Sequence, residues 1–228
     1  MKSVCGDEMK NEKYISGFLA EAKQVIDRMP REDIDKAVEA LFSAWKNGST
    51  VFLIGNGGSA STATHMAADL TKSIAVDGKK RFRAMALVDN IPMVSALTND
   101  NGWENIYTEQ LIAYFRPGDV VVAFSVHGGA GKDRAGAWSQ NLLKALQYAK
   151  DNGGKAIGFA GFDGGAMKQM ADVCVVVPAD STPQVEAFHV VLHHLIAFCL
   201  KEKIKNSSGN FLESGKPAGL PDKIAASK

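Results

Sequence analysis

The sequence predicts a three-layer, doubly wound α/β fold with a five-stranded parallel sheet. Short apolar runs alternate with segments whose apolar residues recur at helical spacing, and that alternation is typical of parallel strands joined by right-handed crossover helices. Gly-rich turns follow the first, third and fourth apolar runs, at residues 55–60, 125–131 and 161–165. Because the carboxyl ends of parallel strands lie at one edge of the sheet, we expect a ligand site there.

The elements are expected in a regular order. Two amphipathic helices, 9–29 and 31–47, are separated at Pro30 and precede the first strand. The predicted strands are 50–54, 82–88, 120–124, 155–159 and 173–177. The predicted helices between and after them are 59–75, 91–97, 103–115, 142–151, a short helix after residue 165, and 182–205. The expected division is a helical extension (1–48) that packs on the core or a neighbouring subunit, an α/β domain (49–205) and a flexible tail (206–228).

Composition narrows the class of protein. The chain has 228 residues, 46% of them hydrophobic, and a formal net charge of +1, which gives no reason to expect nucleic acid or an anionic membrane surface as a partner. No signal peptide and no membrane-spanning run are expected, so the prediction is a cytoplasmic protein. The cysteines, Cys5, Cys174 and Cys199, form no disulfide or metal-binding pattern, and the last two are expected to be buried thiols.

The first Gly-rich turn, Gly55 to Ala60, is the feature around which the chain is organised. It follows four apolar residues and precedes a helix that Ser59 or Ser61 is expected to cap. Glycines allow close approach of a ligand, and a helix N-terminus attracts phosphate. The alternative is a strand-to-helix turn in which the glycines serve geometry only.

Two helices carry titratable residues. His65 and Asp69 lie four residues apart and share a helix face, so the pair suits a metal or acid–base chemistry, although on spacing alone a solvent-facing polar pair is the better explanation. The last helix holds four titratable residues within an apolar pattern, which indicates a functional face. These residues are Glu186, His189, His193 and His194. Spacing alone does not select which of them form that face: Glu186, His189 and His193 align best on an ideal helix, and His194 is offset.

Polar residues also occur at two loops. Asn99 and Asp100 stand at a strand-to-helix junction, where a turn or a helix cap is the ordinary use of such residues. Ser125 and His127 lie in the second Gly-rich turn and offer a hydroxyl and an imidazole to a phosphate, or serve the turn itself.

Taken together, these motifs resemble the sugar isomerase (SIS) domain family, and within it the bacterial phosphoheptose isomerases, which act on sedoheptulose 7-phosphate. The resemblance covers roughly residues 10–204. It rests on GNGGSA (55–60) with His65 and Asp69, and on four further motifs: LTNDNGWE (97–104), RPGDVVVAFS (116–125), GFDGG (161–165) and TPQVEAFH (182–189). It implies a SIS-type fold and a phosphosugar aldose–ketose isomerase that works through an enediol.

The resemblance also implies roles for individual residues. Asp69 and His194 would be catalytic, and a Zn²⁺ ion would be held by His65, Asp69, Glu186 and His194. The sugar phosphate would be bound by residues of the turns and the last helix: Asn56, Gly57, Gly58, Ser59, Asn99, Asp100, Ser125, His127, Gly128 and Glu186. The family is typically a homotetramer whose active sites are shared between subunits.

This chain departs from the family pattern. Asp69 stands where the family has Glu, Glu186 stands where it has Gln, and the phosphate loop lacks two of three hydroxyls. An apparent extension, 131–139, carries Lys132 and Arg134, which are candidates to replace those hydroxyls as phosphate ligands.

Two other functions are compatible with parts of the sequence. One is a non-catalytic SIS-domain protein that binds a sugar phosphate or a protein partner, which the altered loop favours. The other is a dinucleotide-dependent enzyme, because GNGGSA fits a loose dinucleotide fingerprint. Asp89, however, lies further from that turn than a ribose-binding acid usually does.

Overall fold

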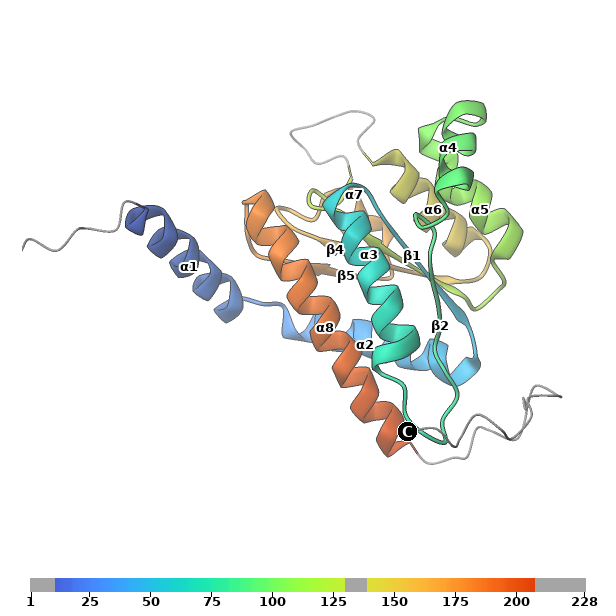
Figure 1. The fold of residues 1–228 in the computed structure, drawn as a ribbon, viewed down its shortest axis with the longest axis horizontal. Coiled ribbons are helices and arrows are strands. Elements are labelled where there is room, and N and C mark those ends of the chain that lie inside the picture. Colours follow the sequence, from blue (N-terminus) through green and yellow to red (C-terminus); the bar gives the residue numbers. More distant parts are fainter. Residues whose placement is uncertain (1–10, 130–138, 208–228) are drawn as a thin grey trace, which may run out of the picture.

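The computed structural model describes residues 11–129 and 139–207. In this part of the chain, parallel strands form one sheet in the order β2-β1-β3-β4-β5 (Figure 1). The strands are β1 (Thr50–Gly55), β2 (Arg83–Ala86), β3 (Val120–Phe124), β4 (Lys155–Ala160) and β5 (Val173–Val176). The predicted five-stranded parallel sheet is therefore confirmed.

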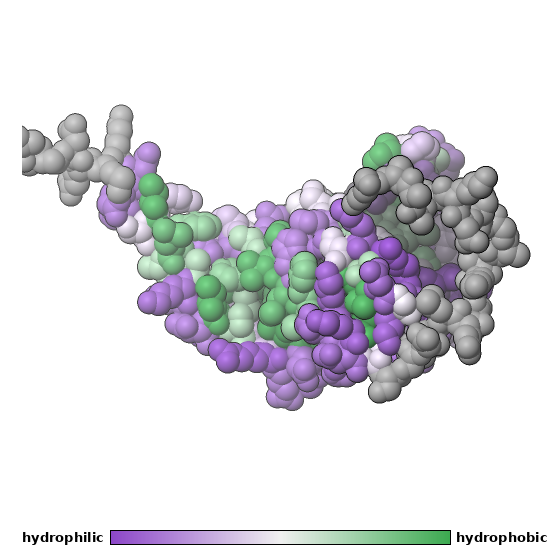
Figure 2. All heavy atoms as spheres, turned by 60° about the horizontal axis from the view of Figure 1, so that its bottom comes forward, coloured by the Kyte–Doolittle hydropathy of each residue, from purple (hydrophilic) through white to green (hydrophobic). Residues whose placement is uncertain are grey.

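Helices cover both faces of the sheet. The helices are α1 (Glu12–Asp27), α2 (Arg31–Asn47), α3 (Gly58–Ala68), α4 (Ile91–Asp100), α5 (Ile106–Tyr114), α6 (Gln140–Asp151), α7 (Gly165–Met170) and α8 (Thr182–Asn206). α2, α3 and α8 pack on one face, while α5, α6 and α7 pack on the other, which gives the predicted three layers. α1 projects from the body of the molecule (Figure 1). Hydrophobic atoms gather on the surface towards this end of the molecule (Figure 2), and the large hydrophobic residues exposed on α1 are Tyr14, Ile15, Leu19 and Ile26.

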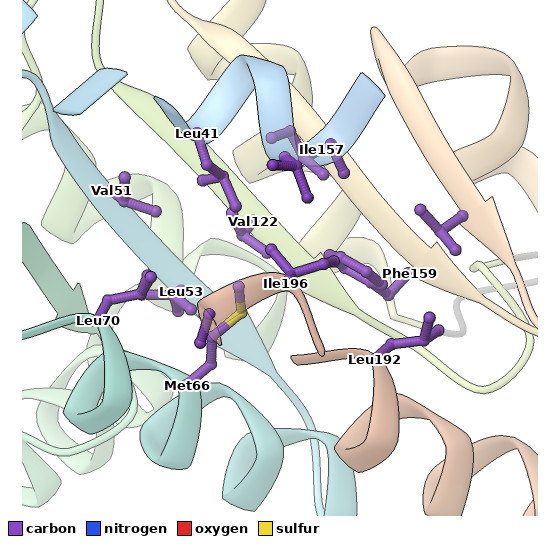
Figure 3. Packing of buried hydrophobic residues seen from close by; sticks show 14 of the residues in the cluster. Leu41, Val51, Leu53, Met66, Leu70, Val122, Ile157, Phe159, Leu192 and Ile196 are labelled. Atoms are coloured by element: carbon purple, nitrogen blue, oxygen red, sulfur yellow. The ribbon is translucent and has the colours of Figure 1, made fainter. Parts of the chain in front are cut away.

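The core explains why the strands read as unbroken apolar runs. Along β1, Val51 and Leu53 pack beneath α2, α3 and α8, while Phe52 and Ile54 face the opposite helical layer. Successive side chains of a strand point to opposite faces, so a strand covered on both faces needs apolar residues at every position. Figure 3 shows side chains of the first layer, with residues of α2, α3 and α8 converging on β1, β3 and β4.

Helix α8 is long and apolar enough to cross a membrane by length and composition, which the sequence analysis did not anticipate. Half of its most apolar window is buried inside the fold, where the helix packs against α2 and α3. This burial is what a core helix requires. The prediction that Cys174 and Cys199 are buried thiols is wrong for Cys199, which is exposed on the outer face of this helix, as are Val191, Leu195 and Phe198. Cys174 is only half-buried.

The helix after the first turn also differs from its prediction. It begins at Gly58 with Gly57 as N-cap, and no side chain caps it, so the expectation that Ser59 or Ser61 caps it is wrong. The α-helix ends at Ala68, and residues Asp69–Ser73 form a π-helix instead of a continuation to residue 75. Three features lie outside the described residues: Cys5, the 131–138 part of the extension with Lys132 and Arg134, and the tail beyond 207.

Candidate active site

A cavity of about 630 Å³ opens at the carboxyl ends of β1 and β3. These neighbouring strands send their following helices, α3 and α6, to opposite faces of the sheet, and that switch point is where open α/β sheets bind ligands. The described residues that line the cavity are Asn56, Ser59, Trp103, Phe124, Ser125, Val126, His127, Ser139, Leu142 and Glu186.

The first turn is held in place from the opposite helical layer. The amide of Asn56 exchanges two hydrogen bonds with the buried amide of Asn141, at 3.0 and 2.8 Å. The buried Tyr107 hydroxyl donates to the carbonyl of Gly55, and burial raises the pKa of Tyr107 to about 12, so this hydroxyl stays protonated as a donor. Gly57 has a φ of +55°, which its lack of a side chain allows. The turn is therefore a pre-formed wall of the cavity.

The second turn forms another wall. The Ser125 hydroxyl is buried and accepts a hydrogen bond from the Gly129 N–H at 3.4 Å. The His127 ring lies against the Phe162 ring with centroids 4.3 Å apart, and Phe162 has a φ of +53° that is rare for a residue with a side chain. Gly128 is buried against the loop after β4. Ser125 and His127 thus reach the cavity from a fixed loop.

A second group of functional side chains lies between α3 and α8. The Oδ2 atom of Asp69 is 3.0 Å from Nδ1 of His194, 3.4 Å from Nδ1 of His193 and 4.0 Å from Nε2 of His65. One donor atom from each of these four residues lies within 4.8 Å of all the others. The structure therefore brings His65, Asp69 and His194 together, as the sequence analysis expected, and adds His193. We call these four residues the histidine–aspartate cluster.

Burial sets the electrostatics of this cluster. The His193 side chain is fully buried and Asp69 is almost so, whereas His65 and His194 are about half exposed. Burial, together with the nearby His194 and His65 and against the opposing effect of Asp69, lowers the pKa of His193 to about 4, so the imidazole is neutral at pH 7. Among the described residues, Asp69 Oδ2 and both ring nitrogens of His193 are buried without a hydrogen-bond partner.

These unpartnered atoms suit a metal ion. Neutral imidazole nitrogens and a carboxylate oxygen are the donors that Zn²⁺ takes from proteins, typically four at a time. Buried polar atoms ordinarily have partners, and a bound ion would supply one here. The half-exposed edges of His65 and His194 leave the cluster open to solvent on one side.

The other predicted site residues lie elsewhere. Glu186 lines the cavity and lies outside the histidine–aspartate cluster, and its Oε1 would be 2.5 Å from a Cβ added at Gly58. Asn99 and Asp100 are exposed at the end of α4 and do not line the cavity, where Trp103 reaches it instead.

His189 is the remaining histidine of α8, and it is a core residue. It is fully buried, its Nε2 donates to the Ala160 carbonyl at 3.3 Å, and burial lowers its pKa to about 4. Because this pKa lies below the value of about 6.5 in an unfolded chain, the unfolded state takes up the proton first. The stability that His189 contributes is therefore present above pH 6.5 and is lost as the pH falls towards 4.

We expect the free energy of unfolding of the metal-free protein to fall by roughly 2–3 kcal/mol between pH 7.5 and pH 4.5 because of His189. In the His189→Gln variant an amide can keep the bond to Ala160 and does not titrate, so this part of the loss should disappear. Urea unfolding at the two pH values measures it. An identical pH dependence in both proteins would contradict the assignment.

The sequence of this chain is similar to those of known proteins. The model of the SIS domain family matches residues 13–161. The lincomycin biosynthesis protein LmbN of Streptomyces lincolnensis is 38% identical over 80% of this chain, which spans 66% of that relative's length. A phosphoheptose isomerase of Geotalea daltonii is 36% identical over 75% of this chain and 84% of its own length.

Solved structures agree with the sequence comparison. The structure of phosphoheptose isomerase GmhA from Neisseria gonorrhoeae superimposes with a TM-score of 0.74 at 26% identity and covers 84% of this chain and 98% of that one. The chain therefore belongs to the SIS domain family. Its relatives within that family include phosphoheptose isomerases, and it is an enzyme of the isomerase class, an intramolecular oxidoreductase.

Proposed function

We propose that this enzyme is a phosphosugar aldose–ketose isomerase that converts sedoheptulose 7-phosphate into glycero-manno-heptose 7-phosphate, with a bound Zn²⁺ ion. The observation that carries the proposal is the position of Asp69 within 3.0–4.0 Å of histidine nitrogens, on the same two helices as the Gly58–Glu186 contact at the cavity and seven or more residues further along them. The names of the relatives, phosphoheptose isomerases from several bacteria, support the substrate.

The separation of the two groups fits a seven-carbon sugar. Gly58 meets Glu186 at the cavity, and seven residues further along both helices His65 meets His193. Seven residues of helix span about 10 Å. In an extended heptulose 7-phosphate, C2 and phosphorus are separated by roughly 9 Å at ordinary bond lengths of about 1.5 Å. A substrate with its phosphate in the cavity would therefore place its carbonyl end near the cluster.

The phosphate end is assigned to the cavity. We propose that the N-terminus of α3 and the two turns bind it, because backbone N–H groups at such turns and the positive end of a helix favour an anion. The residues proposed to bind it are Asn56, Gly57, Gly58, Ser59, Ser125, His127 and Gly128. His127 is the one basic side chain among the described lining residues.

The carbonyl end is assigned to the histidine–aspartate cluster. Asp69 takes a proton from C1 of the ketose while O2 gains a proton to give the enediol; it then returns its proton to C2 while O1 loses one, so that the carbonyl moves from C2 to C1. We assign to His194, whose ring is about half exposed, the transfer of a proton between O1 and O2 of the substrate. When bound, a Zn²⁺ ion would supply Lewis-acid polarisation of the carbonyl. His65, Asp69 and His194 are three of the four ligands that we predicted, and we assign the fourth, Glu186, to the sugar hydroxyls.

We propose a cytoplasmic homotetramer. Exposed apolar residues on two helices support burial against other copies: Tyr14, Ile15, Leu19 and Ile26 on α1, and Val190, Val191, Leu195 and Phe198 on α8. In such an assembly Asn99 and Asp100, exposed at the end of α4, would contact a sugar bound to a neighbouring copy. The division into an extension (1–48), a SIS domain (49–205) and a tail (206–228) remains part of this proposal.

The assay uses protein freed of metal by a chelator, sedoheptulose 7-phosphate, and detection of the aldose phosphate. We expect turnover to be lost without metal and restored by Zn²⁺, and a five-carbon ketose phosphate to react more slowly because it does not span both groups. If zinc-loaded protein gives no turnover but is stabilised thermally by sedoheptulose 7-phosphate, the chain is a sugar-phosphate-binding protein. Absence of both effects would exclude this substrate.

A further inference from the structure

The sequence pattern of the family and the structure of this chain differ on one residue of the cluster. The family pattern assigns the fourth metal donor to position 186, whereas Glu186 lies outside the cluster and His193 lies within it. The His193 ring is packed between the other two imidazoles, with centroids 4.6 Å from His65 and 4.1 Å from His194. We propose that His193 is a metal ligand of this enzyme, so that His65, Asp69, His193 and His194 form a four-donor site within one chain.

The imidazole of His193 makes no hydrogen bond to the described residues, although Asp69 Oδ2 lies 3.4 Å from its Nδ1. Both of its ring nitrogens are buried and lack a hydrogen-bond partner among the described residues, although the side chain is fully enclosed. A buried polar group left in this state costs about 1–3 kcal/mol, and a leucine would avoid that cost. Leu192 and Ile196, its neighbours on α8, are apolar core residues, so an apolar side chain at position 193 would suit the surroundings.

His189 shows what a purely structural histidine looks like on the same helix. It is equally buried, but its Nε2 donates to a carbonyl of β4 at 3.3 Å, and it lies outside the cluster. The two histidines therefore differ in their polar neighbours: His189 is hydrogen-bonded to the backbone, whereas the side chains nearest to the ring nitrogens of His193 belong to the histidine–aspartate cluster. That difference points to a ligand for His193 and to none for His189.

The distances fit one ion. Donors of a tetrahedral Zn²⁺ site with bonds of 2.0–2.2 Å lie roughly 3.4 Å apart. The Asp69 oxygen is 3.4 Å from the His193 nitrogen, 3.0 Å from that of His194 and 4.0 Å from that of His65. All four donor atoms lie within 4.8 Å of one another, as donors to a common ion must.

Glu186 of the same chain is placed for another task. It precedes His193 by seven residues, which is about 10 Å along the helix axis. Its carboxylate lies instead against Gly58 at the cavity. A fourth donor at position 193 leaves Glu186 free to bind the substrate.

The test measures zinc affinity by chelator competition, independently of turnover, in the full-length wild-type protein and three variants. We expect His193→Leu to weaken zinc binding by about 100-fold or more, and Glu186→Gln and the matched control His189→Gln to leave it nearly unchanged. Thermal unfolding adds a second readout. Without metal, His193→Leu should be at least as stable as the wild type, because an unpartnered imidazole has been removed. With excess zinc the wild type should be the more stable protein, because a 100-fold tighter affinity for zinc adds about 2.7 kcal/mol to its free energy of unfolding relative to the variant.

The inference rests on the proposed zinc-assisted function, but the two fail differently. Wild-type protein that binds no zinc would overturn both. Wild-type protein that binds zinc while His193→Leu binds it equally well would overturn only the role of His193, whatever the effect of Glu186→Gln. A His193→Leu variant that is less stable than the wild type without metal would also contradict it, because the imidazole would then have a structural partner.

Discussion

Replacement of Asp69 by asparagine is expected to lower kcat for isomerisation of sedoheptulose 7-phosphate by at least about 1000-fold. A positioned general base contributes about 10²–10⁴-fold, and the amide of asparagine neither accepts the proton nor carries the charge that three histidines surround. The side chain is almost the same size and is nearly buried, so the fold should be retained. Steady-state kinetics of both proteins, with zinc content measured on the same samples, give the result.

The matched control is Asp89→Asn, the same chemical change at an exposed carboxylate outside the cluster and outside the lining of the main cavity. It should keep kcat within about twofold of the wild type. If Asp69→Asn retains more than a tenth of the wild-type kcat with zinc bound, proton transfer belongs to another residue, and Glu186 at the cavity becomes the first alternative.

The sequence predicted the sheet well because the signal for each strand is local. A run such as Val120–Phe124 is apolar at every position, and that pattern is demanded by burial on both faces. Gly-rich turns after β1 and β3 then indicated the edge at which the cavity lies. The π-helix at Asp69–Ser73 was missed, since its local sequence resembles ordinary helix.

The site was predicted less completely because its geometry depends on how two helices pack. The four-residue spacing placed His65 and Asp69 on one face, but nothing on α8 alone shows which of its titratable residues turns towards α3. The structure selects His193 and His194 for the cluster, leaves His189 to the core and leaves Glu186 to the cavity.

Hydrogen bonds between residues far apart in the sequence could not be predicted from the sequence. Asn141 and Tyr107 fix the first turn although they lie 85 and 52 residues from their partners in the sequence. A polar residue in an apolar helix pattern is the only local sign of such a contact, and it does not identify the partner.

A second large effect is expected where the two loops beside the cavity meet. Gly128 has a φ of +63°, and a Cβ added there would lie well under 3.0 Å from the backbone carbonyl of Gly164. Since a backbone atom, unlike a side-chain tip, cannot move aside, we expect Gly128→Ala to lower the free energy of unfolding by about 3 kcal/mol or more. Urea unfolding measures this directly.

The matched control is Gly78→Ala, because Gly78 has a similar φ of +76° but an added Cβ would meet nothing within 4 Å. That variant should lose only the cost of left-handed backbone, about 1 kcal/mol, so the difference between the variants isolates the clash. Relief of the clash would move the loop that carries Ser125 and His127, and a folded Gly128→Ala protein should therefore show a raised KM for the sugar phosphate. Equal losses of stability in the two variants would mean that the loops can separate freely, and that the cavity wall is not fixed by this contact.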